Sequence, residues 1–228
     1  MPSEYWSGRW ERGEIAFHQP QVNADLRRYW PQLQLPSAAR VFVPLCGKSE
    51  DMAWLRAQGH TVIGIELAEL AVAAFFSEHG LQPTQERSGA LQCFRAAGYE
   101  LYVGDFFDLQ AEQLRGVAGV YDRGALIALP PALRQRYAAQ LAARLPAASR
   151  MLLVTVDYPQ EQMPGPPFAV SDAEVRALYG GEFSVRRLAS RDLLEMEPRF
   201  RERGVQTMAE RVSLLERPPA AMGGGAGS

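Results

Sequence analysis

The sequence predicts an α/β protein with a mainly parallel sheet and helices on both faces of that sheet. Short apolar runs alternate along the chain with longer segments whose apolar residues recur at helical spacing. Strand–helix alternation of this kind is typical of parallel sheets, because each crossover between parallel strands passes over a face of the sheet. The chain has 228 residues, 47% hydrophobic and 22% charged, a composition that supports a buried core.

The predicted strands are short apolar runs bounded by glycine, proline or polar residues. In chain order they are residues 40–44, 61–65, 99–103, 119–121, 151–156, 183–185 and 212–215. Residues 151–156 are the most hydrophobic of these runs, so we expect this strand near the centre of the sheet.

The predicted helices have recognisable starts or ends. Gly59 and Gly80 close two of them, a proline opens the third, and Ser171 and Glu174 have the spacing of a capping box before the fourth. The segments are residues 49–58, 68–79 and 131–145 and a helix that begins at residues 171–174.

We expect one domain over residues 1–216. Residues 217–228 are rich in Gly and Pro and have no face that could pack, which predicts a disordered tail. The N-terminus lacks the pattern of a secretion signal, and no apolar run approaches the ~20 residues of a membrane helix, so we expect a cytoplasmic protein without a membrane partner. The net charge of −2 does not favour a nucleic-acid partner.

The loop after the first predicted strand, residues 44–49, runs directly into a helix. Gly47 lets the backbone approach a ligand closely, and the N–H groups at the helix start favour polar ligand groups. A plain strand–helix turn explains the same residues. Glu66 ends the second strand, ~20 residues beyond this loop, where an acid typically accepts hydrogen bonds from ribose hydroxyls. Glu66 could instead cap the next helix.

Two further strand ends hold polar residues. Asp105 could accept a hydrogen bond from an adenine amino group and Phe106 could pack on the ring, although a helix cap and a core position explain them equally well. Asp122 and Arg123 follow the fourth strand, where a structural acid–arginine pair is the alternative to a ligand site.

Several common motifs are absent from the sequence. It contains no GxGxxG, no GxxxxGK[ST], no HExxH and no GxSxG, and only three histidines, so neither a phosphate-binding loop nor a metal site is indicated. A nucleoside cofactor without phosphate fits this profile, and S-adenosyl-L-methionine is the obvious candidate.

Residues 40–55 and 59–67 resemble the thiopurine S-methyltransferase family, above all in the run Pro-Leu-Cys-Gly-Lys at residues 44–48. Residues 122–126 and 164–168 and the N-terminal Trp6, Trp10, Phe17 and His18 strengthen this resemblance, which extends over roughly residues 5–216.

The resemblance implies a Rossmann-like class I methyltransferase with a seven-stranded, mostly parallel sheet that ends in an antiparallel hairpin. It also implies that about residues 1–22 form a lid over the cofactor. Residues that would bind the cofactor are Trp10, Leu45, Glu66, Asp105, Phe106 and Arg123. Residues that would lie beside the substrate are Phe17, Arg123 and Arg199.

The predicted function is therefore S-adenosyl-L-methionine-dependent methylation of aromatic or heterocyclic thiols such as thiopurines. A substrate thiolate or selenolate would attack the methyl group in line, so we expect no dedicated base. His18 could act as a general base, and the alternative, which we favour, is that it anchors the lid. The alternatives are methylation of inorganic selenium or tellurium species or of other small thiol or halide acceptors, and a nucleoside-binding protein without catalysis. No metal and no macromolecular partner are expected, and the chain is expected to be a monomer.

Overall fold

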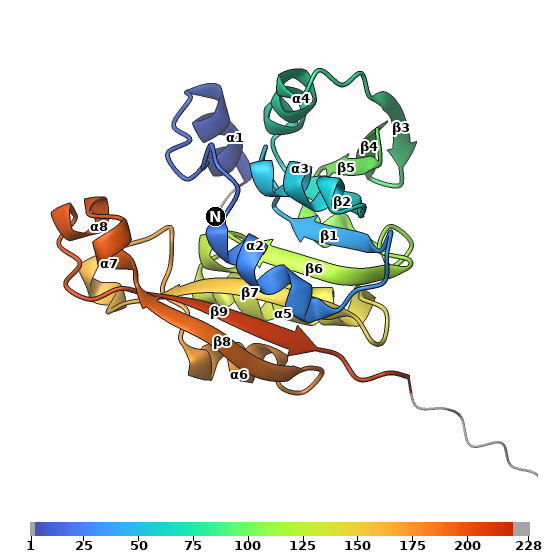
Figure 1. The fold of residues 1–228 in the computed structure, drawn as a ribbon. Helices are drawn as coiled ribbons and strands as arrows, with labels where there is room; N and C mark the ends of the chain where they lie inside the picture. The colour runs from blue at the N-terminus through green and yellow to red at the C-terminus, as the bar shows by residue number, and fades with distance from the viewer. Residues whose placement is uncertain (1–2, 221–228) are drawn as a thin grey trace, which may run out of the picture.

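The computed structural model describes residues 3–220 and contains one sheet, with the strand order β3-β4-β5-β2-β1-β6-β7-β9-β8 (Figure 1). Its central strands β5, β2, β1, β6 and β7 pair in parallel, and the outer pairs are antiparallel. The strands are β1 (Arg40–Pro44), β2 (Thr61–Glu66), β3 (Thr84–Ser88), β4 (Leu91–Ala96), β5 (Tyr99–Val103), β6 (Val117–Arg123), β7 (Arg150–Asp157), β8 (Ser184–Asp192) and β9 (Ala209–Glu216).

The sheet has nine strands, so the expectation of seven is wrong. The additional strands β3 and β4 form a hairpin that extends the sheet beyond β5. The sequence of β3 is Thr-Gln-Glu-Arg-Ser, and its exposed side chains give no apolar alternation from which a strand could be predicted. Arg95 of β4 forms ion pairs with Glu86 of β3 and with Glu100 of β5. These cross-strand ion pairs join the hairpin to the rest of the sheet.

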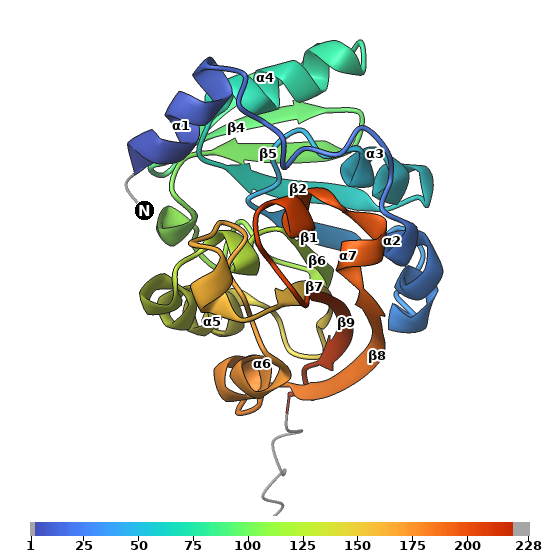
Figure 2. The same ribbon diagram turned by 90° about the vertical axis from the view of Figure 1, so that its left-hand side faces the viewer.

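Helices cover both faces of the sheet, as predicted (Figure 2). One face packs against α2 (Ala24–Tyr29), α3 (Glu50–Ala57) and α4 (Glu69–Glu78). The other face packs against α5 (Pro131–Arg144) and α6 (Asp172–Tyr179). The predicted helix start at Ser171 is confirmed, because its hydroxyl accepts a hydrogen bond from the Glu174 N–H.

The central strands occur where the apolar runs predicted them, and β7 lies inside the sheet between β6 and β9. Three strands extend well beyond their predicted bounds: β6 continues to Arg123, β8 continues to Asp192 and β9 begins at Ala209, because ladder pairing extends past the apolar residues. Arg217 donates hydrogen bonds to the carbonyls of Ala142 and Leu145 at the end of α5. The rest of the predicted tail, from residue 221 on, lies outside the described residues.

Three helices gather at the carboxyl end of the parallel strands (Figures 1 and 2). They are α1 (Ser3–Glu11), α7 (Leu193–Met196) and α8 (Arg199–Glu202). Short 3₁₀ turns occupy η1 (Trp30–Leu33), η2 (Phe106–Asp108), η3 (Leu126–Ala128) and η4 (Gln160–Gln162). Across residues 3–220, no helix combines the length and apolar character needed to cross a bilayer.

Candidate active site

A cavity of about 690 Å³ opens at the carboxyl ends of β1, β2, β5, β6 and β7. Its size is that of a pocket for a small molecule or cofactor. Strand ends form its floor, while α1 and the segment around α7 and α8 contribute the opposite wall. All residues predicted for the site line this one cavity: Trp10, Phe17, Leu45, Glu66, Asp105, Phe106, Arg123 and Arg199.

The loop after β1 has an unusual backbone. Leu45 and Gly47 have positive φ values of 47° and 53°, which turn the chain sharply between β1 and α3. A Cβ atom on Gly47 would lie 3.3 Å from the Trp10 ring, so the bare glycine lets the indole pack directly on the loop. Cys46 is buried against Gly64, and burial raises the pKa of its thiol far above the ordinary value, which agrees with a packing role.

Glu66 joins the ends of β2 and β1. Its carboxylate accepts hydrogen bonds from the backbone N–H groups of Gly47 and Ala68, both at 2.9 Å, while the side chain lines the cavity. Burial raises the pKa of Glu66, and the two N–H donors oppose this rise. An ionised carboxylate has about four acceptor positions, so Glu66 both supports the start of α4 and retains capacity for a ligand.

Asp105 and Phe106 occupy the carboxyl end of β5. The Asp105 carboxylate caps η2 by accepting a hydrogen bond from the Phe107 N–H at 2.8 Å, and this side chain is exposed. Phe106 is buried, with its ring centroid 4.6 Å from that of Tyr137. The structure therefore contains the capping and core contacts and also places both residues at the cavity.

Asp122 and Arg123 do not pair with each other, so the alternative of a mutual ion pair is wrong. Consecutive residues of a strand point to opposite faces of the sheet, which separates the two side chains. Asp122 accepts hydrogen bonds from the Tyr137 hydroxyl at 2.7 Å and the Leu126 N–H at 3.2 Å, and burial raises its pKa to about 6. Arg123 faces the cavity, 3.7 Å from a carboxylate oxygen of Asp51.

Asp51 is an organising residue that the sequence did not reveal. It lies in the first turn of α3, is 1% exposed, and accepts hydrogen bonds from the Tyr121 hydroxyl and the Asn23 N–H. Together with its ion pair to Arg123, these contacts tie α3 and β6 to the segment that follows the N-terminal helix. The only signal in the sequence was its place after the capping Ser49, which is common at ordinary helix starts.

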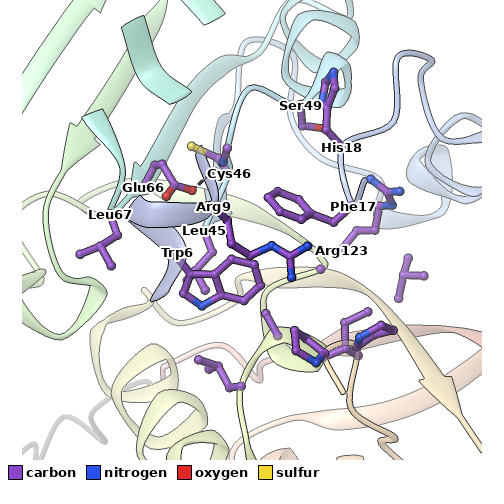
Figure 3. Close-up of a pocket in the computed structure, with 18 of the residues that line it drawn as sticks. Trp6, Arg9, Phe17, His18, Leu45, Cys46, Ser49, Glu66, Leu67 and Arg123 are labelled. Carbon is purple, nitrogen blue, oxygen red and sulfur yellow. Dashed lines mark hydrogen bonds between the residues drawn. The ribbon is translucent and has the colours of Figure 1, made fainter. Parts of the chain in front are cut away.

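Aromatic side chains of the N-terminal segment cover the cavity. The Phe17 ring makes edge-on contacts with Trp6 and Trp10, at centroid distances of 5.5 Å and 5.7 Å. In the view of Figure 3, Trp6, Arg9 and Phe17 lie between Glu66 and Arg123. Trp6 and Arg9 also line the cavity, although neither was predicted as a site residue. Of the two, Trp6 is one of the residues on which the family resemblance rests.

Arg199 connects the two walls of the cavity mouth. Its guanidinium donates a hydrogen bond to the Ala16 carbonyl at 3.0 Å and pairs with Glu197 at 3.0 Å. His18 lies beside this segment, and burial, followed by the positive charge of Lys48, lowers the pKa of its imidazole. Within the described part of the chain, no cluster of three or more His, Cys, Asp or Glu side chains has a metal-binding arrangement.

A solved structure with this architecture defines the class of fold. The Burkholderia thailandensis 1,6-didemethyltoxoflavin-N1-methyltransferase, solved with S-adenosylhomocysteine, is 18% identical, covers 95% of this chain and 87% of its own, and has a TM-score of 0.60. The fold, with its cavity at the carboxyl ends of the strands, is that of a Rossmann-like class I methyltransferase.

Sequence relatives narrow the class to one family. The family model described as Thiopurine S-methyltransferase (TPMT) matches residues 1–218. The Thiopurine S-methyltransferase of Nitrosospira multiformis is 51% identical over 94% of this chain and 98% of its own, and that of Xanthomonas campestris pv. campestris is 50% identical over 95% and 100%. The chain belongs to the thiopurine S-methyltransferase family. The predicted enzyme class, an S-adenosyl-L-methionine-dependent methyltransferase, is thereby confirmed.

Proposed function

We propose that this enzyme methylates the sulfur atom of aromatic and heterocyclic thiols, with thiopurines as the model acceptors. The observation that supports this substrate class is the wall of the cavity mouth, where Trp6, Trp10 and Phe17 form an edge-on aromatic cluster beside Arg123 and Arg199. Aromatic rings provide a large apolar surface for a planar acceptor, and guanidinium groups favour an acceptor that arrives as an anion. The names of the relatives point to the same acceptors.

S-adenosyl-L-methionine supplies the methyl group from a positively charged sulfur. The residues fit this cofactor: Glu66 retains acceptor capacity for ribose hydroxyls, and Leu45 and Gly47 bring the loop backbone close to the cavity. We assign Asp105 and Phe106 to the adenine end of the cofactor. Trp10 would cover the cofactor from the loop side and Arg123 would face it from β6.

Alignment and exclusion of water are the main contributions expected from this chain. The attacking sulfur is negative and the methyl donor is positive, so both charges diminish as the methyl group moves, and a water-poor site favours this change. Phe17 and the two tryptophans would exclude water, while Arg199 would hold the acceptor side closed through the Ala16 carbonyl.

The segment of about residues 1–22 acts in this proposal as a lid on a single domain that ends near residue 216. Trp10 of this segment packs on Gly47, and the Ala16 carbonyl accepts a hydrogen bond from Arg199. Directly after the segment, the Asn23 N–H donates to Asp51. Opening of this segment would admit both ligands. A monomeric state and a cytoplasmic location remain predictions from the sequence.

A screen of acceptors with methyl-labelled S-adenosyl-L-methionine tests the proposed function. We expect labelled S-methyl products from thiopurines and substituted thiophenols, with kcat/KM at least tenfold above the values for hydrogen sulfide, halide, selenite and tellurite. Preference for one of the inorganic acceptors would overturn the substrate assignment. Bound cofactor that never loses its label to any acceptor would overturn catalysis itself.

A further inference from the structure

Glu210 is an acid of the cavity wall that the proposed function has not used. It lies near the start of β9, lines the cavity, and its side chain is 14% exposed. Its nearest charged partner is Arg191 of β8, whose guanidinium nitrogen lies 3.8 Å from a Glu210 carboxylate oxygen, beyond hydrogen-bond distance. Such a carboxylate has acceptor positions to offer a ligand.

Glu210 lies at the end of the cavity away from Glu66. We call this end, where we expect the acceptor to bind, the acceptor half of the cavity. The strand of Glu210, β9, lies four strands from β2, which ends at Glu66, so the backbones of the two strands are about 19 Å apart at the usual spacing of about 4.8 Å per strand. Glu210 pairs in register with Val156 of β7, and Val156 also lines the cavity. A cofactor anchored at Glu66 leaves the end of the cavity near Glu210 for the acceptor.

Charged groups around Glu210 come from three elements. Arg191 lies on β8, Arg123 on β6, and Glu197 on the segment between α7 and α8. Burial raises the pKa of Glu210, the two arginines oppose the rise, and Glu197 adds to it. A carboxylate that ionises less readily than an exposed one is the stronger base.

Heterocyclic thiols with a ring nitrogen next to the carbon–sulfur bond exist in water largely as thiones, with the proton on nitrogen. Methylation at sulfur requires this N–H proton to leave. We propose that the Glu210 carboxylate accepts the ring N–H of a bound thione and takes up its proton during methyl transfer. This inference rests on the proposed function. It assigns a base for neutral acceptors to the site, although no dedicated base was expected from the sequence.

The step balances in atoms and electrons. The proton passes from ring nitrogen to a Glu210 oxygen, the N–H electron pair becomes the C=N bond, and the C=S π pair moves to sulfur. Sulfur forms the bond to the methyl carbon while the methyl–sulfonium bond breaks and leaves its electron pair on the cofactor sulfur. Glu210 returns its proton to solvent after the product leaves.

Two acceptors of different chemistry test the role of Glu210. 6-Mercaptopurine is a thione with a ring N–H, whereas 4-nitrothiophenol has no ring nitrogen and is already a thiolate near neutral pH. For Glu210→Gln we expect the ratio of kcat/KM, 6-mercaptopurine over 4-nitrothiophenol, to fall at least tenfold at pH 6.5. Glu195→Gln changes an exposed carboxylate of α7 and is the matched control, which is expected to keep the wild-type ratio.

The pH profile gives a second readout that a purely structural role would not change. As the pH rises through the pKa of the purine N–H, the acceptor arrives deprotonated, so the deficit of Glu210→Gln with 6-mercaptopurine should shrink. If Glu210→Gln loses kcat/KM equally with both acceptors at every pH, the proposal is overturned. Glu210 would then act only by balancing the positive charges of Arg123 and Arg191. Absence of methyl transfer by the wild-type enzyme to either acceptor would instead contradict the proposed function.

Discussion

The two halves of the cavity are constructed differently. The cofactor half is formed by the ends of β1, β2 and β5 and the loops that follow them directly, with Trp10 of the N-terminal segment packed on the first of these loops. Its central carboxylate, Glu66, is buried and bonded to two backbone N–H groups. The acceptor half is assembled from the N-terminal segment, β9 and the region of α7 and α8, and its side chains Phe17 and Arg199 are 41% and 46% exposed.

The positions of the groups in the cofactor half are fixed by the sheet, whereas the positions of the groups in the acceptor half depend on the lid. Groups at strand ends have their positions set by the ladder, so the cofactor half is pre-organised. Groups of the acceptor half meet only when segments more than a hundred residues apart touch, as in the Arg199–Ala16 contact. Changes in the first half should therefore alter cofactor affinity, and changes in the second half should alter acceptor kinetics.

Removal of the Glu66 carboxylate is expected to have the largest effect. Glu66→Ala should weaken binding of S-adenosylhomocysteine by about a hundredfold or more, since each lost hydrogen bond to a charged group contributes about 1.5–3 kcal/mol. Isothermal titration calorimetry measures this loss. Glu66→Gln, which keeps an acceptor for Gly47 or Ala68, should fall between Glu66→Ala and wild type. Unchanged affinity in a folded Glu66→Ala protein would remove Glu66 from the cofactor site.

The buried Asp122 carboxyl group is expected to contribute differently to the stability of the fold at different pH values. Its pKa, raised to about 6 from 3.8, means that the folded state holds this proton more tightly than the unfolded state. As the pH rises from about 4 to 6, the unfolded chain releases its proton first, and wild type loses up to about 3 kcal/mol of unfolding free energy from this group. Above pH 6 the penalty is complete.

Asp122→Asn cannot ionise, so its unfolding free energy relative to wild type should increase between pH 4 and pH 7. Urea unfolding at both pH values measures the difference. The exposed Asp108→Asn is the control and should show no such change. If the difference in unfolding free energy between Asp122→Asn and wild type is the same at both pH values, folding does not raise the pKa of Asp122.

Gly47→Ala tests the close approach of the lid to the cofactor loop. At φ 53° the alanine costs about 1–2 kcal/mol, and its methyl group meets the Trp10 ring. Gly80→Ala imposes a similar strain at φ 64° with nothing within 4 Å. Thermal unfolding should show similar destabilisation of both variants, whereas calorimetry should show weaker cofactor binding, by about three- to tenfold, only for Gly47→Ala. Equal affinities would show that Trp10 does not cover the cofactor.

Arg199→Ala is expected to have the smallest effect. Loss of its bonds to Ala16 and Glu197 should raise the acceptor KM about two- to fivefold, because partly exposed contacts of this kind contribute about 1 kcal/mol or less. The affinity for S-adenosylhomocysteine should change less than threefold. Steady-state kinetics with a thiopurine measures KM, and Arg201→Ala on the same helix is the exposed control. A larger effect on the cofactor than on the acceptor would contradict the division of the cavity.

The same division explains what could be predicted from the sequence. The loop of residues 44–49 and the acids at strand ends were recognisable because a parallel sheet places its carboxyl ends together. Asp51 and Glu210 were not recognisable as site residues, because their roles depend on which strands and helices face them in the folded chain. β3 escaped prediction because its exposed polar residues leave no periodic signal, and its pairing with β4 is visible only in three dimensions.

A double-mutant cycle on Glu66→Ala and Glu210→Gln tests the central claim, that the two halves act independently, most directly. The measured quantity is kcat/KM for 6-mercaptopurine at a fixed concentration of S-adenosyl-L-methionine far below its Kd for each protein. If the halves are independent, the two losses multiply in the double variant, with a coupling energy below about 0.5 kcal/mol. A coupling energy above about 1 kcal/mol would contradict the claim and show that the cofactor and acceptor ends form a single energetic unit.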